Sequence, residues 1–294
     1  MPAFDVIVCG SLHLDIMVYA PSLPRLDETT VGTRWAQQSG GKGGNQAVMA
    51  ARAGARTAMI GRVGDDDFGR RLRAHLTAAR VDTQAVLVDP VAGSGMSAAI
   101  VRNDGEYGAV IVSGANLGIA PQVATDAWLE IGGARVLVLQ NEIPDAANAA
   151  VAKAARAADA LVILNAAPAR ALSSAVCAAV DMLVVNRVEA EMMSGESVRD
   201  EAGARHVVAA LGALYRNVIV TLGGEGLFVK TTDEAIRQIA PKPVKVVSTH
   251  GAGDCFVGSL AAKLAQGGGV IEAAEFANAA AAGHVSHDGS ANMG

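Results

Sequence analysis

The chain has 294 residues, of which 51% are hydrophobic and only 3% aromatic, and it carries a formal net charge of −5. This length suffices for one large domain with an aliphatic core. The mixed charge, without a basic run, argues against nucleic acid or a membrane surface as the main partner, although a local group of N–H donors can bind a small polyanion at any net charge.

The N-terminus and the cysteines indicate where the protein resides. The first ten residues, "MPAFDVIVCG", contain no basic segment followed by a long apolar one, so we expect no signal peptide. No stretch of ~18 residues is apolar throughout, so we expect no membrane span. Cys9, Cys177 and Cys255 are odd in number and far apart, which fits neither a disulfide framework nor a zinc site. They predict reduced thiols in a cytoplasmic protein.

Residues 1–114 predict one buried strand and a small, half-exposed sheet. "FDVIVCG" is almost wholly apolar, whereas "HLDIMVYA" and "ETTVGTRWAQQSGG" carry alternating polar residues. "GMSAAIVRNDGEYGAVIVSGA" predicts a hairpin that turns at Asn103, Asp104 and Gly105. The half-exposed segments come from two ranges, about 12–38 and 94–114. We therefore expect a small β lid inserted into the main domain.

From residue 134 onward, short β-branched runs alternate with alanine-rich helical stretches. The predicted strands are "ARVLVLQ", "ALVILN", "DMLVVN" and "NVIVTLGG", and the predicted helices between them are "DAANAAVAKAARAA", "ARALSSAVCAAV" and "VEAEMMSG". Buried runs separated by helices are typical of parallel strands with crossover helices. The sequence therefore predicts an α/β fold over 1–294, in which a doubly wound, mostly parallel sheet has helices on both faces and carries the β lid.

Each predicted strand ends in a polar or glycine-rich group. These groups are Asn141-Glu142, Asn165, Asn186 and Thr221 to Gly224, and Gly251 to Asp254 follow them in the chain. Asn and Gly also end strands without any functional role. Open parallel sheets, however, bind ligands at the carboxyl ends of their strands, and five such groups on one edge favour a site.

Two glycines and a carboxylate stand at the start of an apolar helix in "HGAGDCFVGSLAAKL", residues 250–264. The glycines leave backbone N–H groups uncovered, and the helix directs its free N–H groups and positive dipole end at the same turn. Gly251, Ala252 and Gly253 therefore predict an anion hole for a transferring phosphoryl group, with Asp254 placed to accept a proton from an attacking hydroxyl. The alternative is that Asp254 is an ordinary N-cap, which leaves the two glycines unexplained.

Two further segments give weaker signals. "SGGKGGNQAVMAARAG", residues 39–54, is neither a Walker A loop nor a GxGxxG motif. Its bare backbone, Lys42 and Asn45 suit the hydroxyls of a polar substrate, and the alternative is a flexible strand-to-helix turn. "NRVEAE" places Asn186 and Glu189 one helical turn apart, which suits a hydrated magnesium ion. On this segment alone, a solvated acidic helix start is the stronger interpretation.

Together, "GGKGGNQAV", "LNAAPAR", "TLGGEG" and "GAGDCFVGSL" resemble the ribokinase family of carbohydrate kinases over about residues 5–290. The resemblance implies an α/β sandwich with a β lid and dimerisation through that lid. It also implies an ATP-dependent kinase, a phosphotransferase that moves the γ-phosphoryl group to a primary hydroxyl of a small sugar such as ribose or a related pentose or ketose. Magnesium and a monovalent cation, K⁺, are the implied ions.

The resemblance also implies roles for individual residues. Asp254 is implied as the general base, and the implied anion hole comprises Gly251, Ala252 and Gly253 together with the N–H of Asp254. The implied sugar ligands are His13, Asp15, Gly41, Lys42, Gly43, Asn45, Glu142 and Asp254. The implied nucleotide contacts are Asn186, Thr221, Gly223, Gly226, Gly253 and Asn278. Asn186 and Glu189 match the motif that organises magnesium through water, and Ser248 and His250 lie where the monovalent cation binds.

The sequence departs from the family pattern at three places. His13 stands where family members typically carry Asn, so a bulkier imidazole is expected to reshape the sugar pocket. Ser248 replaces an Asp that ligates the monovalent cation, and losing that carboxylate predicts weaker K⁺ binding. The sequence also ends at "HDGSANMG", short of the usual last helix and within the usual cation loop. We expect either that a terminal segment is missing from this sequence or that the protein lacks it.

Two other functions stay open at this point. A nucleoside kinase of the same family needs a stacking surface over the base, for which Tyr19, Trp35, Tyr107 or His13 are the candidates near the lid. A non-catalytic sugar-binding or regulatory protein could share the fold, because fold alone does not guarantee activity. The intact Asp254 segment argues against this second alternative.

Overall fold

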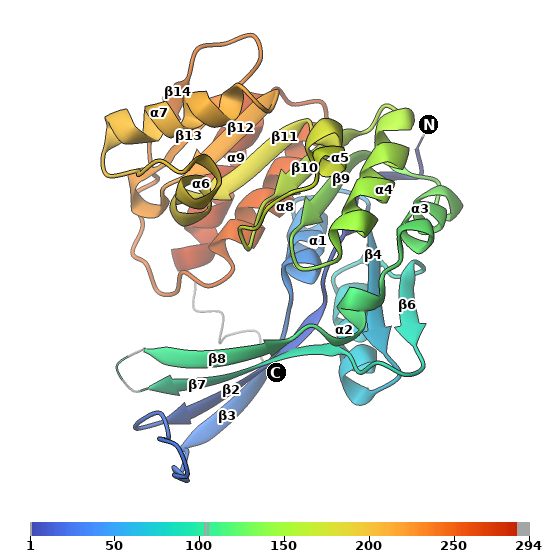
Figure 1. Ribbon diagram of the computed structural model, residues 1–294, viewed down its shortest axis with the longest axis vertical. Coiled ribbons are helices and arrows are strands. Elements are labelled where there is room, and N and C mark those ends of the chain that lie inside the picture. Colours follow the sequence, from blue (N-terminus) through green and yellow to red (C-terminus); the bar gives the residue numbers. More distant parts are fainter. Residues whose placement is uncertain (1, 103, 105, 287–294) are drawn as a thin grey trace.

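The computed structural model describes residues 2–102, 104 and 106–286, and its main body is a ten-stranded sheet with helices on both faces (Figure 1). The strand order is β14-β13-β12-β11-β10-β9-β1-β4-β5, with β6 paired to β4. All pairs are parallel except those that β13 makes with β12 and β14. The strands are β1 (Phe4–Cys9), β4 (Thr57–Gly64), β5 (Val81–Asp82), β6 (Val86–Asp89), β9 (Ala134–Gln140), β10 (Leu161–Asn165), β11 (Met182–Asn186), β12 (Asn217–Thr221), β13 (Leu227–Lys230) and β14 (Arg237–Ile239).

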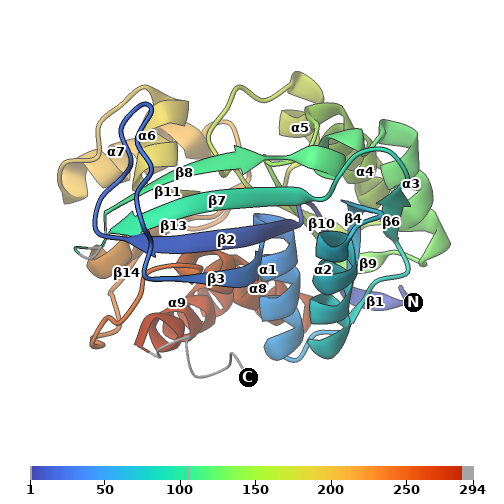
Figure 2. The ribbon, with the colours of Figure 1, turned by 90° about the horizontal axis from the view of Figure 1, so that it is seen from below.

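Alternate side chains of each central strand enter two separate cores, because successive residues of a strand point to opposite faces. Val6 and Val8 of β1 belong to the core that packs against α1, α2, α8 and α9, whereas Ile7 and Cys9 belong to the core under α3 to α7 (Figure 2). The helices are α1 (Lys42–Arg52), α2 (Asp67–Ala78), α3 (Pro121–Glu130), α4 (Asp145–Ala157), α5 (Ser174–Ala179), α6 (Arg187–Ser194), α7 (Glu201–Gly212), α8 (Ala252–Ala265) and α9 (Val270–Ser286). The predicted doubly wound α/β fold is confirmed.

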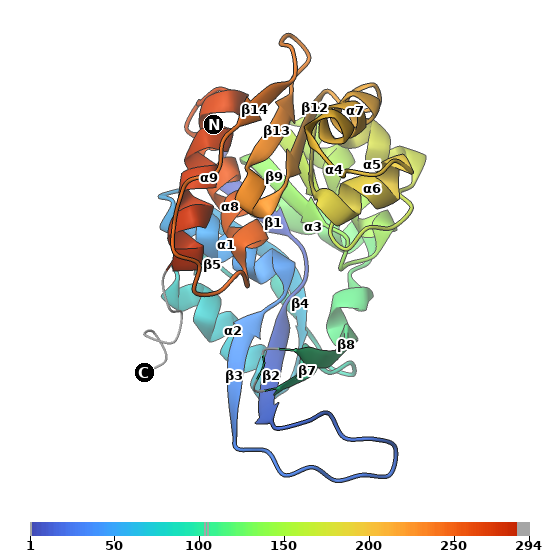
Figure 3. The same cartoon turned by 90° about the vertical axis from the view of Figure 1, so that its left-hand side faces the viewer.

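A second, four-stranded sheet projects from the main body (Figures 1 and 3). Its order is β3-β2-β7-β8, with β2 and β7 parallel and the other pairs antiparallel. Its strands are β2 (His13–Ala20), β3 (Arg34–Gly40), β7 (Gly95–Arg102) and β8 (Tyr107–Val112). The strands lie within the two ranges predicted for the lid, except that β3 extends two residues beyond 38. The predicted turn residues Asn103 and Gly105 lie outside the described residues. Motion of this sheet as a lid stays a prediction.

Two features of the fold differ from the sequence-based expectation, and the start of α1 adds a detail to it. The helix expected over 169–180 begins only at Ser174, where the Ser173 hydroxyl accepts a hydrogen bond from the Val176 N–H. The antiparallel strands β13 and β14 at one edge of the sheet were not predicted. Helix α1 begins at Lys42, so the glycines that follow lie in its first turn; a Cβ on Gly43 would lie 2.6 Å from the backbone nitrogen of Ser11.

Two expectations concern the ends of the chain and the membrane. Over residues 2–102, 104 and 106–286, none of the helices combines the length and the apolar character that crossing a membrane requires. The segment "HDGSANMG", residues 287–294, lies outside the described residues.

Candidate active site

Asp254 lies in the first turn of α8 and faces α1. Its Oδ2 accepts a hydrogen bond from Asn45 Nδ2, and its Oδ1 accepts one from Gln46 Nε2, both at 3.0 Å. Helix α8 is capped by Gly251, which adopts φ 74° and ψ 0°, and there is no side-chain cap. Asp254 is therefore not an N-cap, because both of its oxygens are bound by side chains of another helix.

The N-terminus of α8 presents backbone donors beside this carboxylate. In the described part of the chain, the N–H groups of Gly253 and Asp254 have no hydrogen-bond acceptor, whereas the Ala252 N–H donates to the Thr249 carbonyl at 3.3 Å. A Cβ on Gly253 would meet no atom within 4 Å, so the space beside this residue is open. Two free N–H groups at a helix N-terminus can bind an anion.

A cavity of about 200 Å³, here called the site cavity, joins the predicted groups. Its lining includes Lys42, Asn165, Ala167, Asn186, Glu189, Gly251, Gly253 and Asp254. These residues come from α1, from the ends of β10 and β11, and from the starts of α6 and α8. Of the five polar or glycine-rich groups in the strand-end pattern, Asn165, Asn186 and Gly251 to Asp254 contribute to this cavity, whereas Asn141-Glu142 and Thr221 to Gly224 do not line it.

Two carboxyl groups of the site cavity have perturbed acidity. Burial raises the pKa of Asp254, while the positive charge of Lys42 and the hydrogen bonds from Asn45 and Gln46 act in the opposite direction. Burial also raises the pKa of Glu189, and the backbone N–H of Asn186 and the charge of Lys42 oppose this shift. Lys42 therefore favours the ionised form of both carboxyl groups.

The predicted sugar ligands gather around Glu142. Its Oε2 accepts hydrogen bonds from the Ser11 hydroxyl and, at 3.0 Å, from the backbone N–H of Lys42. His13 Nδ1 lies 3.9 Å from the same oxygen, and His13 is only 4% exposed. In the described structure, the buried His13 Nε2 has no hydrogen-bond partner. Such a group is available to a polar ligand.

The second sheet contributes Asp15, whose Oδ1 accepts a hydrogen bond from the Ser97 hydroxyl at 2.5 Å. Gly40 stands close to this carboxylate, since a Cβ on Gly40 would lie 2.1 Å from Asp15 Oδ2. Asn116 holds the residue before β2 in place. Its side chain accepts a hydrogen bond from the Leu12 N–H and donates one to the Leu12 carbonyl, both at 2.8 Å. The start of β2 is therefore tied firmly to the main body.

Asn186 and Glu189 form a capping box at the start of α6. The Asn186 side chain accepts the Glu189 N–H, and Glu189 Oε2 accepts the Asn186 N–H, both at 2.9 Å. One Glu189 oxygen takes part in no such bond, and the residue is only 9% exposed. Within the described residues there is no group of three or more His, Cys, Asp or Glu side chains that could hold a metal ion. The arrangement fits a magnesium ion held mainly by waters and phosphates, with one carboxylate supplied by the protein.

The predicted nucleotide contacts are less closely grouped. Thr221 ends β12 and donates its hydroxyl to the Val185 carbonyl at 3.4 Å, and a Cβ on Gly223 would meet nothing within 4 Å. The backbone of Gly226 packs closely against the end of β14, because a Cβ added at this position would lie 2.2 Å from the Ile239 carbonyl oxygen. Asn278 on α9 donates to the Ala240 carbonyl at 2.9 Å. The last two residues therefore brace the segment after β14, and nucleotide contacts by them stay a prediction.

The proposed cation residues lie on the exposed segment 240–251. Ser248 Oγ accepts the His250 N–H at 3.3 Å, and His284 Nε2 lies 3.0 Å from the His250 carbonyl oxygen. The segment contains no acidic residue. This segment could therefore supply only neutral oxygens to a cation.

Three residues near the chemistry were missing from the predicted site. Ser11 binds Glu142, Gln46 binds Asp254, and Asn165, which was noted only as a strand end, lines the site cavity. Gln46 carries the one usable signal, because it is a polar residue in the apolar pattern of α1. Ser11 offers no such signal, since it lies in the connection between β1 and β2, where a polar residue is common.

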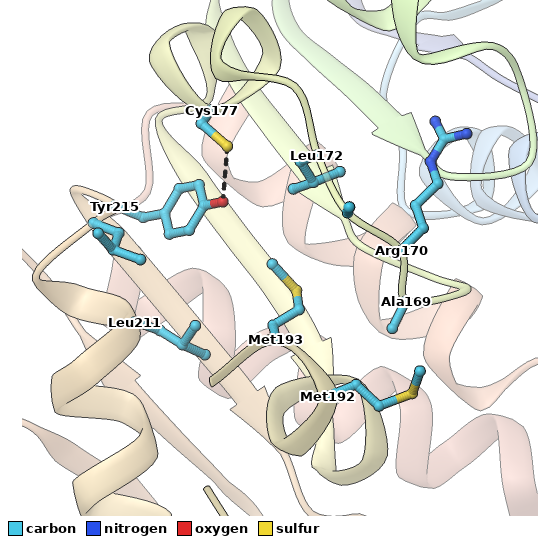
Figure 4. A pocket seen from close by; sticks show the side chains of 10 residues that line it. Ala169, Arg170, Leu172, Cys177, Met192, Met193, Leu211 and Tyr215 are labelled. Carbon is cyan, nitrogen blue, oxygen red and sulfur yellow. Dashed lines mark hydrogen bonds between the residues drawn. The ribbon is translucent and has the colours of Figure 1, made fainter. Parts of the chain in front are cut away.

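A larger cavity of about 360 Å³ lies away from this chemistry (Figure 4). Its lining is mostly apolar and comes from α5, α6, α7 and the segment after β10, including Leu172, Met192 and Met193. Cys177 Sγ lies 3.4 Å from the Tyr215 hydroxyl at one end of it. No carboxyl group lines this cavity.

Comparisons with known proteins agree on one family. Residues 3–293 match the model of the pfkB family of carbohydrate kinases. The chain is 34% identical to the ribokinase of Bacillus subtilis (strain 168), over 94% of this chain and 91% of that protein, and 36% identical to the ribokinase of Mus musculus, over 90% and 82%. It also superimposes on the Arabidopsis thaliana ribokinase complexed with ribose and ATP, with a TM-score of 0.89 and 29% identity over 97% of this chain and 93% of that one.

Proposed function

The chain belongs to the pfkB family of carbohydrate kinases, and on that premise we propose that it transfers the γ-phosphoryl group of ATP to a primary hydroxyl of a small sugar, with Asp254 as general base. A ribokinase-type carbohydrate kinase is a phosphotransferase with an alcohol group as acceptor. The observation that carries the proposal is the position of Asp254, whose carboxylate lies beside the free N–H groups of α8 in the site cavity.

The reaction needs little covalent work from the protein, since phosphoryl transfer depends mainly on positioning and charge stabilisation. The sugar hydroxyl oxygen attacks the γ-phosphorus, its proton passes to Asp254, and the bond from the γ-phosphorus to the bridging oxygen breaks, so that ADP leaves. Oδ2 is the oxygen that we assign to the proton, because its partner Asn45 is only half-buried, whereas Gln46 on Oδ1 is fully buried.

Two groups stabilise the charge that builds on the transferring phosphoryl group. The N–H groups of Gly253 and Asp254 are fixed donors at the positive end of α8, and fixed donors need no reorganisation during the reaction. Lys42 supplies a positive charge to the same cavity. Magnesium, which Glu189 and Asn186 would hold through water, would neutralise phosphate charge.

The sugar is proposed to bind between Glu142, His13, Asp15 and the first turn of α1. The small sheet is proposed to close over it as a lid and to mediate dimerisation. The outer strand β8 supports the proposed dimerisation, because its residues Val110, Ile111 and Val112 are 67%, 60% and 52% exposed. An exposed apolar sheet edge is a surface that proteins normally cover.

A nucleoside acceptor has less support than a small sugar. Trp35 and Tyr107 are 66% and 69% exposed, and the Tyr19 ring is already covered by the Arg34 guanidinium, 3.3 Å from its centroid. Two of the candidate aromatic rings are thus open to solvent, and the third is already occupied by an arginine. The pocket thus suits hydroxyl groups better than a base.

The test is ADP release with magnesium and ATP across a panel of pentoses, hexoses and nucleosides. We expect one or a few sugars to be phosphorylated and Asp254→Ala to abolish this turnover while it still binds ATP. A nucleoside as the sole substrate would favour the alternative kinase. No ADP with any acceptor, together with a rise in melting temperature with a sugar, would favour a binding protein.

A further inference from the structure

A buried row of amide side chains runs behind the Asp254 carboxylate. Gln46 Nε2 donates to Asp254 Oδ1 and to Asn165 Oδ1, each at 3.0 Å, and Gln46 Oε1 accepts a hydrogen bond from Gln140 Nε2 at 2.7 Å. Gln46 and Gln140 are both 0% exposed. The amide of Gln46 has two donor hydrogens and one acceptor oxygen, and all of them are engaged.

The direction of this row is fixed by the two acceptors of Gln46, Asp254 and Asn165. An ionised carboxylate only accepts hydrogen bonds, so Gln46 must turn its NH₂ group toward Asp254. Asn165 also presents its oxygen to Gln46, because its own NH₂ group donates to the Val184 carbonyl at 3.1 Å. Gln140 then has to present its NH₂ group to the remaining oxygen of Gln46. A reversed Gln46 would place its carbonyl oxygen against two acceptors.

The row is rigid because it is enclosed by backbone. Gln140 is the last residue of β9, and a Cβ on Gly10 would lie 1.8 Å from Gln140 Oε1 and 3.0 Å from the Gly43 Cα. Neither glutamine side chain is exposed to bulk solvent. Gln46 is also absent from the lining of the site cavity. It can therefore act on the reaction only through Asp254 or Asn165.

We propose that Gln46 is a positioning residue for the phosphoryl transfer, which holds one oxygen of Asp254 so that the other faces the acceptor hydroxyl, and that Gln140 acts only by orienting Gln46. This inference rests on the proposed role of Asp254 as general base. A carboxylate with one oxygen fixed cannot rotate, so its free lone pairs point in one direction. The charged groups that also face Asp254 are Lys42, Glu142 and Glu189, which Gln46 does not contact.

The test uses Gln46→Met, Gln140→Met and the double variant. Methionine keeps the unbranched shape but removes the donor. We expect Gln46→Met to lower kcat roughly 10- to 100-fold, the size expected for a lost hydrogen bond to a charged group, with little change in the KM for the sugar. Gln140→Met is expected to lower kcat about 3- to 10-fold, and the double variant is expected to match Gln46→Met, since Gln140 acts through Gln46.

The matched control is Asn148→Leu. Asn148 is another fully buried amide, which donates to the backbone carbonyl of Gln140 at 2.7 Å but contacts neither Gln46 nor Asp254. It is expected to lower the melting temperature and leave kcat unchanged. A purely structural role for Gln46 would instead make Gln46→Met and Asn148→Leu behave alike.

The outcomes separate this inference from the proposed function. Full activity of Asp254→Ala would overturn the proposed function. Loss of activity in Asp254→Ala with a wild-type kcat in Gln46→Met would overturn the inference alone. Independent, multiplying effects of the two glutamine substitutions would refute the oriented row. If Gln46→Met fails to fold, a wild-type kcat in Gln140→Met refutes it equally well.

Discussion

Gly251 and Gly195 offer a matched pair for testing the anion hole. Both adopt φ 74° at a helix end, Gly251 as the N-cap of α8 and Gly195 as the C-cap of α6. Placing an alanine in this left-handed region costs about 1–2 kcal/mol, because its Cβ approaches the following carbonyl oxygen. With an unfolding entropy of about 2.1 cal/mol/K per residue, a chain of this length loses roughly 2–3 °C in melting temperature.

The two substitutions differ in their surroundings and in the expected effect on catalysis. A Cβ on Gly251 would lie 3.1 Å from His284 Nε2, whereas one on Gly195 would meet nothing within 4 Å. Relaxation of Gly251→Ala would move the N–H groups of Gly253 and Asp254, and losing one such donor costs about 10²–10³-fold in kcat. We expect Gly251→Ala to lose at least about 10-fold in kcat and Gly195→Ala to lose only stability.

The assays are thermal unfolding and steady-state turnover with saturating sugar and ATP. An unchanged kcat for Gly251→Ala, with the expected loss of melting temperature, would show that the start of α8 is not an anion hole. An unchanged melting temperature in both variants would refute the strain argument itself.

Three further predictions concern charge and specificity. Burial raises the pKa of Asp254, so the folded state binds more protons than the unfolded state once the pH exceeds the ordinary value of 3.8, and ionisation of this group lowers stability as the pH rises. Asp254→Asn is therefore expected to raise the melting temperature at neutral pH, and this gain is expected to shrink toward pH 4. The same substitution is expected to lower kcat about 10²–10⁴-fold. A melting temperature that is lowered at every pH would contradict the stability argument. Ser248→Asp is expected to reduce the K⁺ concentration for half-maximal activation on the order of ten-fold, because it adds an anionic oxygen, and an unchanged K⁺ titration would place the cation elsewhere. His13→Asn is expected to shift kcat/KM toward ribose relative to other pentoses by about 10-fold or more, measured by ADP release, and an unchanged ratio would exclude His13 from the sugar pocket.

The main sheet could be predicted from the sequence because its signals are local. Buried strands such as 134–140 and 161–165 are short apolar runs, and each is followed by an alanine-rich helix. The shortened α5 and the antiparallel β13 and β14 could not be predicted in the same way. Their limits depend on which neighbour supplies hydrogen bonds, and that is decided by tertiary contacts.

The candidate site was predictable where glycine and charge coincide at a helix start, as at Gly251 to Asp254. It was not predictable where the side chain is neutral and its partner is distant in sequence. Gln46 and Asp254 are 208 residues apart, and Ser11 and Glu142 are 131 residues apart. A buried glutamine in a helix looks like an isolated polar residue until the fold brings its acceptor to it.

The groups proposed for phosphoryl transfer lie in the main body, whereas two of the residues proposed to bind the sugar lie on the small sheet. Lys42, Glu189 and Asp254 line one cavity of the main body. The helices to which they belong, α1, α6 and α8, pack on the large sheet. His13 and Asp15 instead begin the small sheet, which the main body holds through Asn116 at Leu12. A substitution on β2 can therefore change which hydroxyls are recognised without moving the base or the anion hole. For this reason the departure at His13 bears on the identity of the sugar, and the intact start of α8 bears on the chemistry.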